Sequence, residues 1–210
     1  MTRCNAMARL PKVATNRPWY YQSISAPAPT GAPSLPAPLG KGGKRILLLG
    51  SGGSGKTTFA LRLAALTGLP VVHLDAHYWR PHWTEPDKPT WRAQVAALTE
   101  QDTWIMDGNY LSSLDLRLPR ADAVFFFDIP NWRCLWNILK RRLRYAGQTR
   151  PDMALGCPEK IDFAFVQWVW RYPRRDKVRV LEALDIWKNP ATPVVIFKDY
   201  AAVEAFFAAN

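Results

Sequence analysis

The sequence predicts one α/β domain in which a parallel sheet is covered by helices on both faces. Apolar runs of strand length alternate with helical stretches, at residues 45–49, 70–75, 103–107, 123–128 and 192–197. Continuously apolar strands are typical of parallel sheets that are buried on both faces. The first run is followed directly by a glycine-rich loop, GSGGSGKT at residues 50–57, and then by a predicted helix. Strand, glycine loop and helix in this order is the setting of a phosphate-binding loop, or P-loop.

The helices follow from apolar spacing and from residues that begin or end helices. They are predicted at residues 58–66, 90–100, 130–146, 161–187 and from about residue 199. Thr90 is expected to be the N-cap of the second helix. Gly147 is expected to end the third, and Pro173 is expected to break the fourth into two.

Residues 1–43 differ in composition from the rest of the chain. They are rich in proline, alanine and serine, and they hold no acidic residue but five basic ones, Arg3, Arg9, Lys12, Arg17 and Lys41. Such a segment cannot bury enough apolar surface to fold, so a disordered tail is expected there. The folded domain is then expected to span residues 44–210.

Composition excludes several classes of protein. No run of about 20 apolar residues occurs, so no membrane span or membrane partner is expected. The three cysteines lack C-x-x-C spacing, which favours neither disulfides nor zinc and indicates a reducing, cytoplasmic location. The net charge of +11 suits nucleic acid or small polyphosphates. No nucleic-acid-binding motif accompanies the charge, which favours the polyphosphate interpretation.

The P-loop predicts how a nucleoside triphosphate binds. The backbone N–H groups of the loop and the N-terminus of the following helix would hold the phosphates. Lys56 would reach the β- and γ-phosphates, and Thr57 would place its hydroxyl on Mg²⁺. The expected ATP-binding residues are Gly50, Ser51, Gly52, Gly53, Ser54, Gly55, Lys56, Thr57 and Thr58.

Two of the predicted strands end in an acidic residue, Asp75 and Asp107. Ligands bind outside the carboxyl ends of the strands in open α/β sheets, so both side chains are expected near the P-loop. Asp107 is expected to hold Mg²⁺ through water, as a Walker-B-type acid. Asp75 is expected either to accept a proton from an acceptor hydroxyl or to position the acceptor. A turn or cap aspartate is the alternative for both, and Asp128 is interpreted mainly as a structural cap.

Aromatic residues are dense after the second predicted strand. Tyr78, Trp79 and Trp83 could stack on a base or sugar, or they could form a small aromatic core that fixes a long loop. Together with Asp75, Asn109 and Tyr110 they are the expected acceptor-binding residues. His73 is expected to be a core histidine.

Two basic clusters, at residues 140–144 and 171–179, flank a segment at about 147–160 that is expected to form a lid. Phosphoryl transfer needs positive charge on the transferred group, and a closing lid can supply arginines for it. Arg142, Arg150 and Arg175 are the residues expected in this role. A solvated helix face is the alternative for each arginine singly.

With these motifs the chain resembles the adenylate-kinase-like branch of P-loop proteins. Residues 107–110, DGNY, stand where those proteins carry D-G-F-P-R, residues 127–130, FDIP, match their F-D-V-P turn, and residues 141–142 match an arginine pair at the lid hinge. The chain is more closely similar to the bacterial DNA topology modulation proteins, or adenylate-kinase-related proteins. Their segments H-L-D, D-G-N-Y, T-R-P-D-M and G-C-P-E occur here at residues 73–75, 107–110, 149–153 and 156–159.

The resemblance implies a five-stranded parallel sheet in the order 2-3-1-4-5, ATP binding and a lid. The residues and the resemblance together predict a kinase that uses Mg²⁺ and ATP and phosphorylates a small acceptor, which would be a nucleotide, a nucleoside or another hydroxyl compound. The alternative is a nucleotide-dependent regulatory protein, related to DNA topology, without small-molecule kinase activity.

Overall fold

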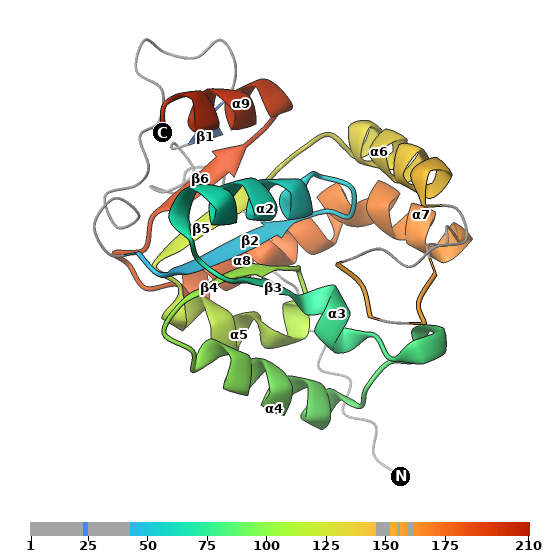
Figure 1. Ribbon diagram of the computed structural model, residues 1–210, viewed down its shortest axis with the longest axis horizontal. Helices are drawn as coiled ribbons and strands as arrows, with labels where there is room; N and C mark the ends of the chain where they lie inside the picture. Colours follow the sequence, from blue (N-terminus) through green and yellow to red (C-terminus); the bar gives the residue numbers. More distant parts are fainter. Residues whose placement is uncertain (1–22, 25–42, 146–151, 155, 159–161) are drawn as a thin grey trace, which may run out of the picture.

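The computed structural model describes residues 23–24, 43–145, 152–154, 156–158 and 162–210. Its described strands form one sheet in which neighbouring strands run parallel, in the order β1-β6-β5-β2-β4-β3 (Figure 1). The strands are β1 (Ser23–Ile24), β2 (Arg45–Gly50), β3 (Val71–His73), β4 (Trp104–Asp107), β5 (Ala123–Phe127) and β6 (Val194–Phe197). The order β3-β4-β2-β5-β6 is the predicted 2-3-1-4-5, so the predicted P-loop α/β fold is confirmed.

Helices cover both faces of the sheet (Figure 1). One face carries α2 (Lys56–Thr67), α6 (Asn131–Arg144), α7 (Phe163–Arg171) and α9 (Tyr200–Ala208), whose buried residues share one core cluster. The other face carries α4 (Lys88–Thr99), α5 (Leu114–Arg117) and α8 (Asp176–Trp187), which share the second cluster. Shorter elements connect them: α3 (Leu74–Tyr78), η2 (Pro81–Trp83), η3 (Leu111–Ser113), η4 (Leu118–Arg120) and η5 (Tyr172–Arg174).

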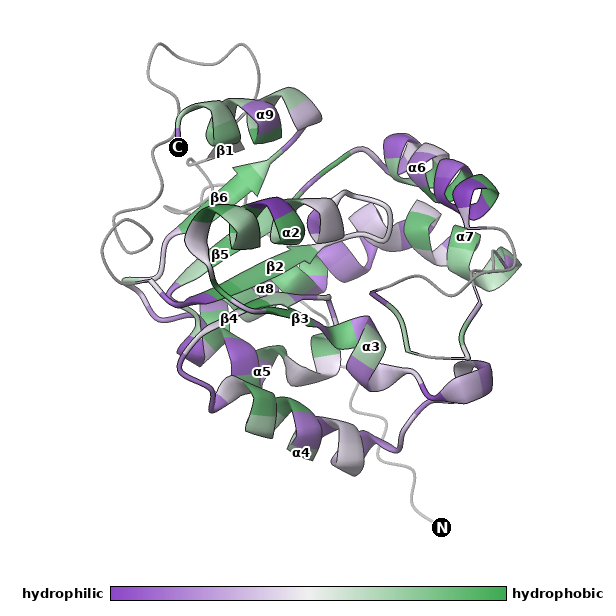
Figure 2. Ribbon diagram, in the orientation of Figure 1, coloured by the Kyte–Doolittle hydropathy of each residue, from purple (hydrophilic) through white to green (hydrophobic). Residues whose placement is uncertain are grey.

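The alternation of side chains along β2 explains the two cores. Ile46 and Leu48 point into the α2 cluster, whereas Leu47 and Leu49 point into the α4 cluster, and all four are fully buried. Figure 2 shows the resulting band of hydrophobic strands between the two helical layers. This burial on both faces is why the strands are continuously apolar.

Several predicted element boundaries differ from the observed ones. The second strand ends at His73, and Leu74–Tyr78 is a helix, so Asp75 lies in the first turn of α3 and not at a strand end. The N-cap of α4 is Asp87, whose Oδ1 accepts a hydrogen bond from the Thr90 backbone N at 2.9 Å. The prediction that Thr90 is the N-cap is therefore wrong.

The interpretation of Asp128 as a cap is also wrong, because its carboxylate pairs with Lys177 Nζ at 2.6 Å and α6 has no side-chain cap. The predicted break near Pro173 is confirmed by η5, which separates α7 from α8.

The expected tail at 1–43 lies outside the described residues, apart from Ser23–Ile24 and Gly43. In the part of the chain that the structure describes, no helix is long and apolar enough to cross a membrane.

Asp122 joins the start of β2 to the start of β5. Its Oδ2 accepts hydrogen bonds from the backbone N of Lys44 at 2.9 Å and of Arg45 at 3.0 Å, and its Oδ1 accepts one from the Arg45 guanidinium at 2.9 Å. Burial alone would raise the pKa of Asp122, but the Arg45 side chain and the two backbone N–H groups lower it below its usual value.

We expect Asp122→Asn to lower the free energy of unfolding by about 1.5–3 kcal/mol at pH 7, because hydrogen bonds to a charged acceptor are lost. The pKa in the folded state lies below that in the unfolded state, so this stability is present above about pH 4 and disappears as the pH falls through the folded-state pKa. Urea unfolding at pH 7 and pH 3 measures the effect, with the exposed Asp185→Asn as control. An equal difference at both pH values would contradict this assignment.

Candidate functional site

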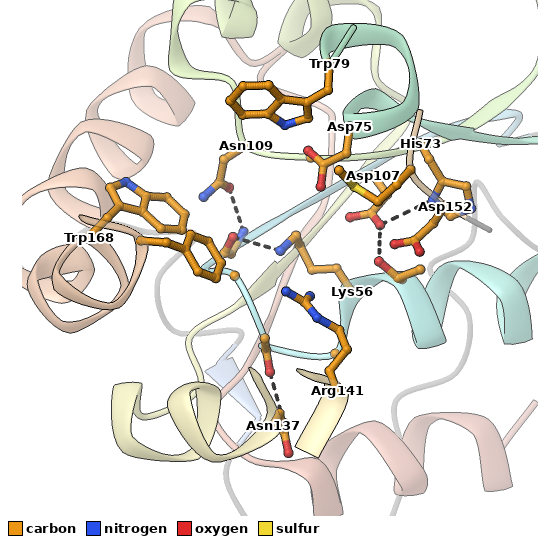
Figure 3. Close-up of a pocket in the computed structure, with 18 of the residues that line it drawn as sticks. Lys56, His73, Asp75, Trp79, Asp107, Asn109, Asn137, Arg141, Asp152 and Trp168 are labelled. Atoms are coloured by element: carbon orange, nitrogen blue, oxygen red, sulfur yellow. Dashed lines mark hydrogen bonds and ion pairs between the residues drawn. The ribbon is translucent and has the colours of Figure 1, made fainter. Parts of the chain in front are cut away.

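The carboxyl ends of β2, β3 and β4 open into a cavity of about 1260 Å³ (Figure 3). It is lined by residues from the P-loop, from α3 and η2, from the loop after β4, and from α6 and α7. Sites for one small molecule usually measure about 300–1000 Å³, and this cavity exceeds that range. Its position is the one at which open α/β sheets bind ligands.

The P-loop follows a path that its glycines make possible. Gly53 has φ +75°, and a Cβ there would lie 2.4 Å from the carbonyl oxygen of Cys134 in α6. Gly50 has φ +147°, and a Cβ there would lie 2.8 Å from Phe127 Cβ. A residue with a side chain would be strained at both positions and would also clash with its neighbours. The loop therefore packs closely against α6 and β5 and leads directly into the N-terminus of α2.

Two asparagines hold this loop from opposite sides. Asn109 Oδ1 accepts a hydrogen bond from Gly50 N at 2.9 Å, and Asn137 Nδ2 in α6 donates one to Gly53 O at 2.9 Å. Lys56 Nζ donates to Gly50 O at 3.0 Å and to Ser51 O at 2.8 Å, so its charge lies over the loop (Figure 3). The structure thus places a fixed cationic group at a helix N-terminus, where anions are favoured.

The predicted ATP-binding residues of the P-loop divide into two groups. Gly50, Gly52, Gly53, Gly55, Lys56, Thr57 and Thr58 line the cavity. Ser51 and Ser54 are buried and are not among the lining residues.

Thr57, Asp107 and His73 meet beside the start of α2. Thr57 Oγ1 donates a hydrogen bond to Asp107 Oδ2 at 2.7 Å, and His73 Nδ1 lies 3.5 Å from the same oxygen. Burial alone would raise the pKa of Asp107, but His73, Lys56 and Thr57 lower it, so the carboxylate is ionised at neutral pH. Burial alone would lower the pKa of His73, but the nearby Asp107 carboxylate raises it. His73 therefore belongs to the site, and its interpretation as a core histidine is wrong.

This group fits the binding preferences of Mg²⁺. A hydroxyl and a carboxylate are hard oxygen donors, and Mg²⁺ is commonly held by one or two such groups together with phosphate oxygens and water. Within the described residues, no group of three His, Cys, Asp or Glu could hold a metal by itself. A metal at Thr57 and Asp107 would thus depend on a bound nucleotide.

Asp75 and Tyr110 meet on another side of the cavity. Tyr110 Oη donates a hydrogen bond to Asp75 Oδ1 at 2.6 Å, and both residues line the cavity. Burial, together with the charge of Asp75, raises the pKa of Tyr110, so its hydroxyl remains a donor at every physiological pH. Asp75 comes from α3 and Tyr110 from the loop after β4, so the contact ties two elements together.

A buried arginine fixes the loop that carries Asn109 and Tyr110. Arg117 in α5 is fully buried and donates to the backbone carbonyls of Gly108 at 2.8 Å and Tyr110 at 2.9 Å, and also to that of Asn109. No pattern in the sequence indicated this role, because the partners are main-chain atoms.

The rings of the aromatic segment divide between the cavity wall and a small aromatic core. Trp79 and Trp83 line the cavity, with ring centroids 5.2 Å apart. Tyr78 is not a lining residue; its ring packs against Trp91 at 4.9 Å and against Tyr110 at 4.6 Å. Tyr78 thus belongs to the aromatic core that supports the other two rings.

The cavity takes its basic residues mainly from α6. Lys140, Arg141 and Arg144 line it, and Figure 3 shows Arg141 on the side of Lys56 opposite Asp75. Arg142 and Arg175 are not lining residues, and Arg150 lies outside the described residues. Buried Cys134 and Ile138 are spaced by four residues, and Arg141 follows three later on the same face. That spacing is a signal that favours Arg141 over its neighbour Arg142.

The part of α7 that faces the P-loop is aromatic. Phe165 and Trp168 stack with centroids 5.8 Å apart, and a Cβ on Gly52 would lie 3.0 Å from Phe165 and 3.2 Å from Trp168. Asp152 and Met153, from the segment where a lid is expected, also line the cavity.

No protein-family model matches the chain, and no curated protein matches its sequence. Solved structures with a similar arrangement include three kinases. Shikimate kinase from Acinetobacter baumannii in complex with shikimate has 16% identity and a TM-score of 0.47, with 81% of this chain and 93% of that chain covered. A gluconokinase from Sinorhizobium meliloti 1021 has 17% identity and a TM-score of 0.45, with 79% and 89% covered.

Deoxyadenosine kinase from M. mycoides with bound dCTP has 13% identity and a TM-score of 0.39, with 76% and 95% covered. At such identities and TM-scores these similarities carry no argument about activity. The strand order and the P-loop geometry themselves define the chain as a P-loop α/β protein.

Proposed function

We propose that this protein is an ATP-dependent kinase that transfers the γ-phosphate of ATP to the hydroxyl group of a small acceptor. The observation that carries the proposal is that a P-loop lysine and a carboxylate line different sides of one cavity. Lys56 lies over the P-loop, Asp75 lies in α3, and both line the cavity (Figure 3). The volume of about 1260 Å³ exceeds the usual range for one small molecule.

At the donor end, the loop amides and the start of α2 would hold the triphosphate. Lys56 would exchange its bonds to Gly50 O and Ser51 O for bonds to phosphate oxygens. Arg141 would add positive charge beside the transferred group. Thr57 and Asp107 would hold Mg²⁺, which when bound neutralises charge on the phosphate oxygens.

At the acceptor end, the Asp75 carboxylate would act as a general base. The acceptor hydroxyl oxygen forms a bond to the γ-phosphorus, and the bond from the γ-phosphorus to the bridging β–γ oxygen breaks. The electron pair of that bond leaves with ADP, and the hydroxyl proton goes to Asp75. Tyr110 positions the carboxylate through the 2.6 Å hydrogen bond.

We expect Asp75→Asn to reduce kcat for a hydroxyl acceptor by about 10²–10⁴-fold, because an amide cannot take the proton. The dissociation constant for ATP should remain unchanged, since the hydrogen bonds that hold the P-loop come from Asn109, Asn137 and Lys56. Single-turnover kinetics and ATP titration measure the two quantities. For a monophosphate acceptor, which is already anionic, the variant should only weaken transfer. An equal loss for both acceptor kinds would remove the general-base role.

A nucleotide-dependent regulator, related to the DNA topology modulation proteins, is a second candidate. The net charge of +11 favours it, and so does the surface of α6, where exposed Trp132 and Trp136 lie beside Arg133 and Lys140. Such a protein should bind DNA with an affinity that falls steeply with salt and should phosphorylate no small molecule. DNA titrations at about 50 and about 200 mM salt would separate the two candidates, because an affinity that depends on phosphate contacts falls steeply between these concentrations.

A further inference from the structure

We propose that the outer surface of helices α6 and α7 binds an anionic lipid membrane. This inference goes beyond the proposed kinase function and does not depend on it. The lack of a long apolar run in the sequence bears on spanning helices alone, so the expectation of no membrane partner does not cover a contact of this kind. Three features lead to the proposal: an exposed apolar stripe, the cations beside it, and the lack of acidic residues along both helices.

Exposed hydrophobic side chains are concentrated on these two helices. Among the described residues, ten large hydrophobic side chains are exposed, and six of them belong to α6 and α7. They are Trp132, Trp136, Leu139 and Leu143 in α6, and Phe163 and Trp170 in α7. We call these six side chains the outer apolar surface.

The part of the outer apolar surface in α6 forms one stripe along the helix. Its residues are spaced by four, three and four positions, which places them one above the other on a single side. Buried Cys134 and Ile138 lie on the opposite side of the helix. The stripe therefore points away from the core, and its side chains are between 46% and 74% exposed.

The residues of α7 extend this surface. Phe163 and Trp170 are seven positions apart and so share one side of α7. Asn131 Nδ2, at the start of α6, donates a hydrogen bond to Trp170 O at 3.1 Å. The end of α7 is thus joined to the end of α6 that carries Trp132, and Figure 1 shows the two helices side by side.

The cations of α6 lie beside the stripe. The Arg133 guanidinium lies 5.1 Å from the centre of the Trp132 ring, and Lys140 Nζ lies 5.3 Å from the centre of the Trp136 ring. Residues 129–145 and 163–175 contain eight basic residues and no acidic one. The basic residues are Arg133, Lys140, Arg141, Arg142, Arg144, Arg171, Arg174 and Arg175. Lys140, Arg141 and Arg144 also line the cavity, and the others do not.

The acids that border these two ranges have other roles. Asp128 pairs with Lys177 Nζ at 2.6 Å. Asp162 caps α7 by accepting a hydrogen bond from Phe165 N at 2.8 Å, and Asp176 is buried. The charge along the two helices is therefore strongly positive, and a binding partner is expected to be anionic.

An anionic membrane surface matches both the apolar stripe and the charge. Helices that lie in the membrane interface combine Trp, Phe and Leu with Lys and Arg, whose aliphatic stems reach from the apolar layer to the anionic headgroups. A second copy of the chain would bring the same positive charges against the first. DNA would match the cations, but Leu139 and Leu143 have no ring to stack on a base.

Cosedimentation of the whole purified chain with lipid vesicles tests the proposal without any protein partner. One set of vesicles contains phosphatidylcholine and phosphatidylserine, and the other contains phosphatidylcholine alone. We expect the partition coefficient to be at least about tenfold higher for the anionic vesicles, because one basic residue at an anionic leaflet contributes about fivefold. Raising the salt from about 0.1 M to about 1 M should reduce this excess, because the Debye length falls from about 10 Å to about 3 Å.

Two pairs of variants test the two parts of the surface. Leu143→Ser should lower the partition coefficient on anionic vesicles by about fivefold or more, because less apolar area is buried. The matched control is Ile186→Ser, at a 68% exposed position of α8 on the other face of the sheet, and it should change nothing. Arg133→Gln should lower the coefficient by about fivefold, whereas Lys88→Gln, at the start of α4, should leave it unchanged.

Several results would overturn the inference. These are no sedimentation with either kind of vesicle, equal sedimentation with both, or equal effects of Leu143→Ser and Ile186→Ser. A wild-type protein that ignores vesicles but binds duplex DNA, and loses that binding in Arg133→Gln, would assign the surface to nucleic acid instead. Analytical ultracentrifugation gives a further check, because a wild-type dimer that Leu143→Ser dissociates would show that a second copy covers the stripe.

Discussion

Replacing Lys56 with methionine is expected to reduce phosphoryl transfer by about 10²–10³-fold or more, because it removes the positive group that would stabilise the transferred phosphate. Lys56 Nζ bonds only to loop carbonyls in the described structure, Gly50 O and Ser51 O, so these bonds are available for exchange with a nucleotide. Methionine keeps the length and apolar stem of the side chain, so the P-loop should retain its path through Gly50 and Gly53.

Single-turnover transfer with saturating ATP measures this effect. The matched control is Lys88→Met, which removes the same charge from an exposed position at the start of α4. The control should keep wild-type activity, and both variants should unfold at the wild-type denaturant concentration. An active Lys56→Met protein would remove the P-loop lysine from the proposed mechanism.

Replacing Arg117 with methionine is expected to cause the largest loss of stability, about 3–5 kcal/mol. The guanidinium is fully buried and donates to the carbonyls of Gly108 and Tyr110, and removing it breaks these buried hydrogen bonds. Burial lowers the pKa of Arg117 to about 9, so the side chain is still charged at neutral pH. Its loss should also release the loop that carries Asn109 and Tyr110, and so weaken binding at both ends of the cavity.

Urea unfolding at pH 7 measures the stability, with Arg120→Met as the control. Arg120 lies three residues further on and pairs with exposed Glu100 at 2.7 Å, so its removal should cost about 0–1 kcal/mol. Similar losses for the two variants would show that the buried bonds of Arg117 contribute little. Where Arg117→Met is folded, a raised KM for acceptor with a smaller change in kcat would identify a positioning role.

The parts of the site that could be predicted from the sequence are those whose residues all lie in one continuous segment of the chain. The P-loop and the DGNY segment at 107–110 each combine a strand end with a polar loop, and their placement follows from the strand order. Asp75 lies in a helix and not at the end of a strand as predicted. The sequence misleads here because Leu74 is apolar and continues the strand pattern, although the backbone at Leu74 is already helical.

Other parts depend on contacts between distant segments. His73 and Asp107 are register partners in neighbouring parallel strands, so their pairing requires the β3–β4 register. Arg141 differs from Arg142 only in its position around α6, which the packing of Cys134 and Ile138 determines. Arg117 bonds to main-chain carbonyls, which leave no pattern of side chains to recognise.

The proposed transfer is tested most directly by incubating the protein with Mg·ATP and a panel of nucleosides, nucleoside monophosphates and small hydroxyl metabolites. Phosphorus NMR follows the appearance of a new phosphomonoester and of ADP, with Lys56→Ala as the inactive comparison. We expect at least one member of the panel to gain a phosphate in amounts equal to the ADP formed, and the variant to form none. ATP that binds without phosphorylating any member of the panel would contradict the kinase function.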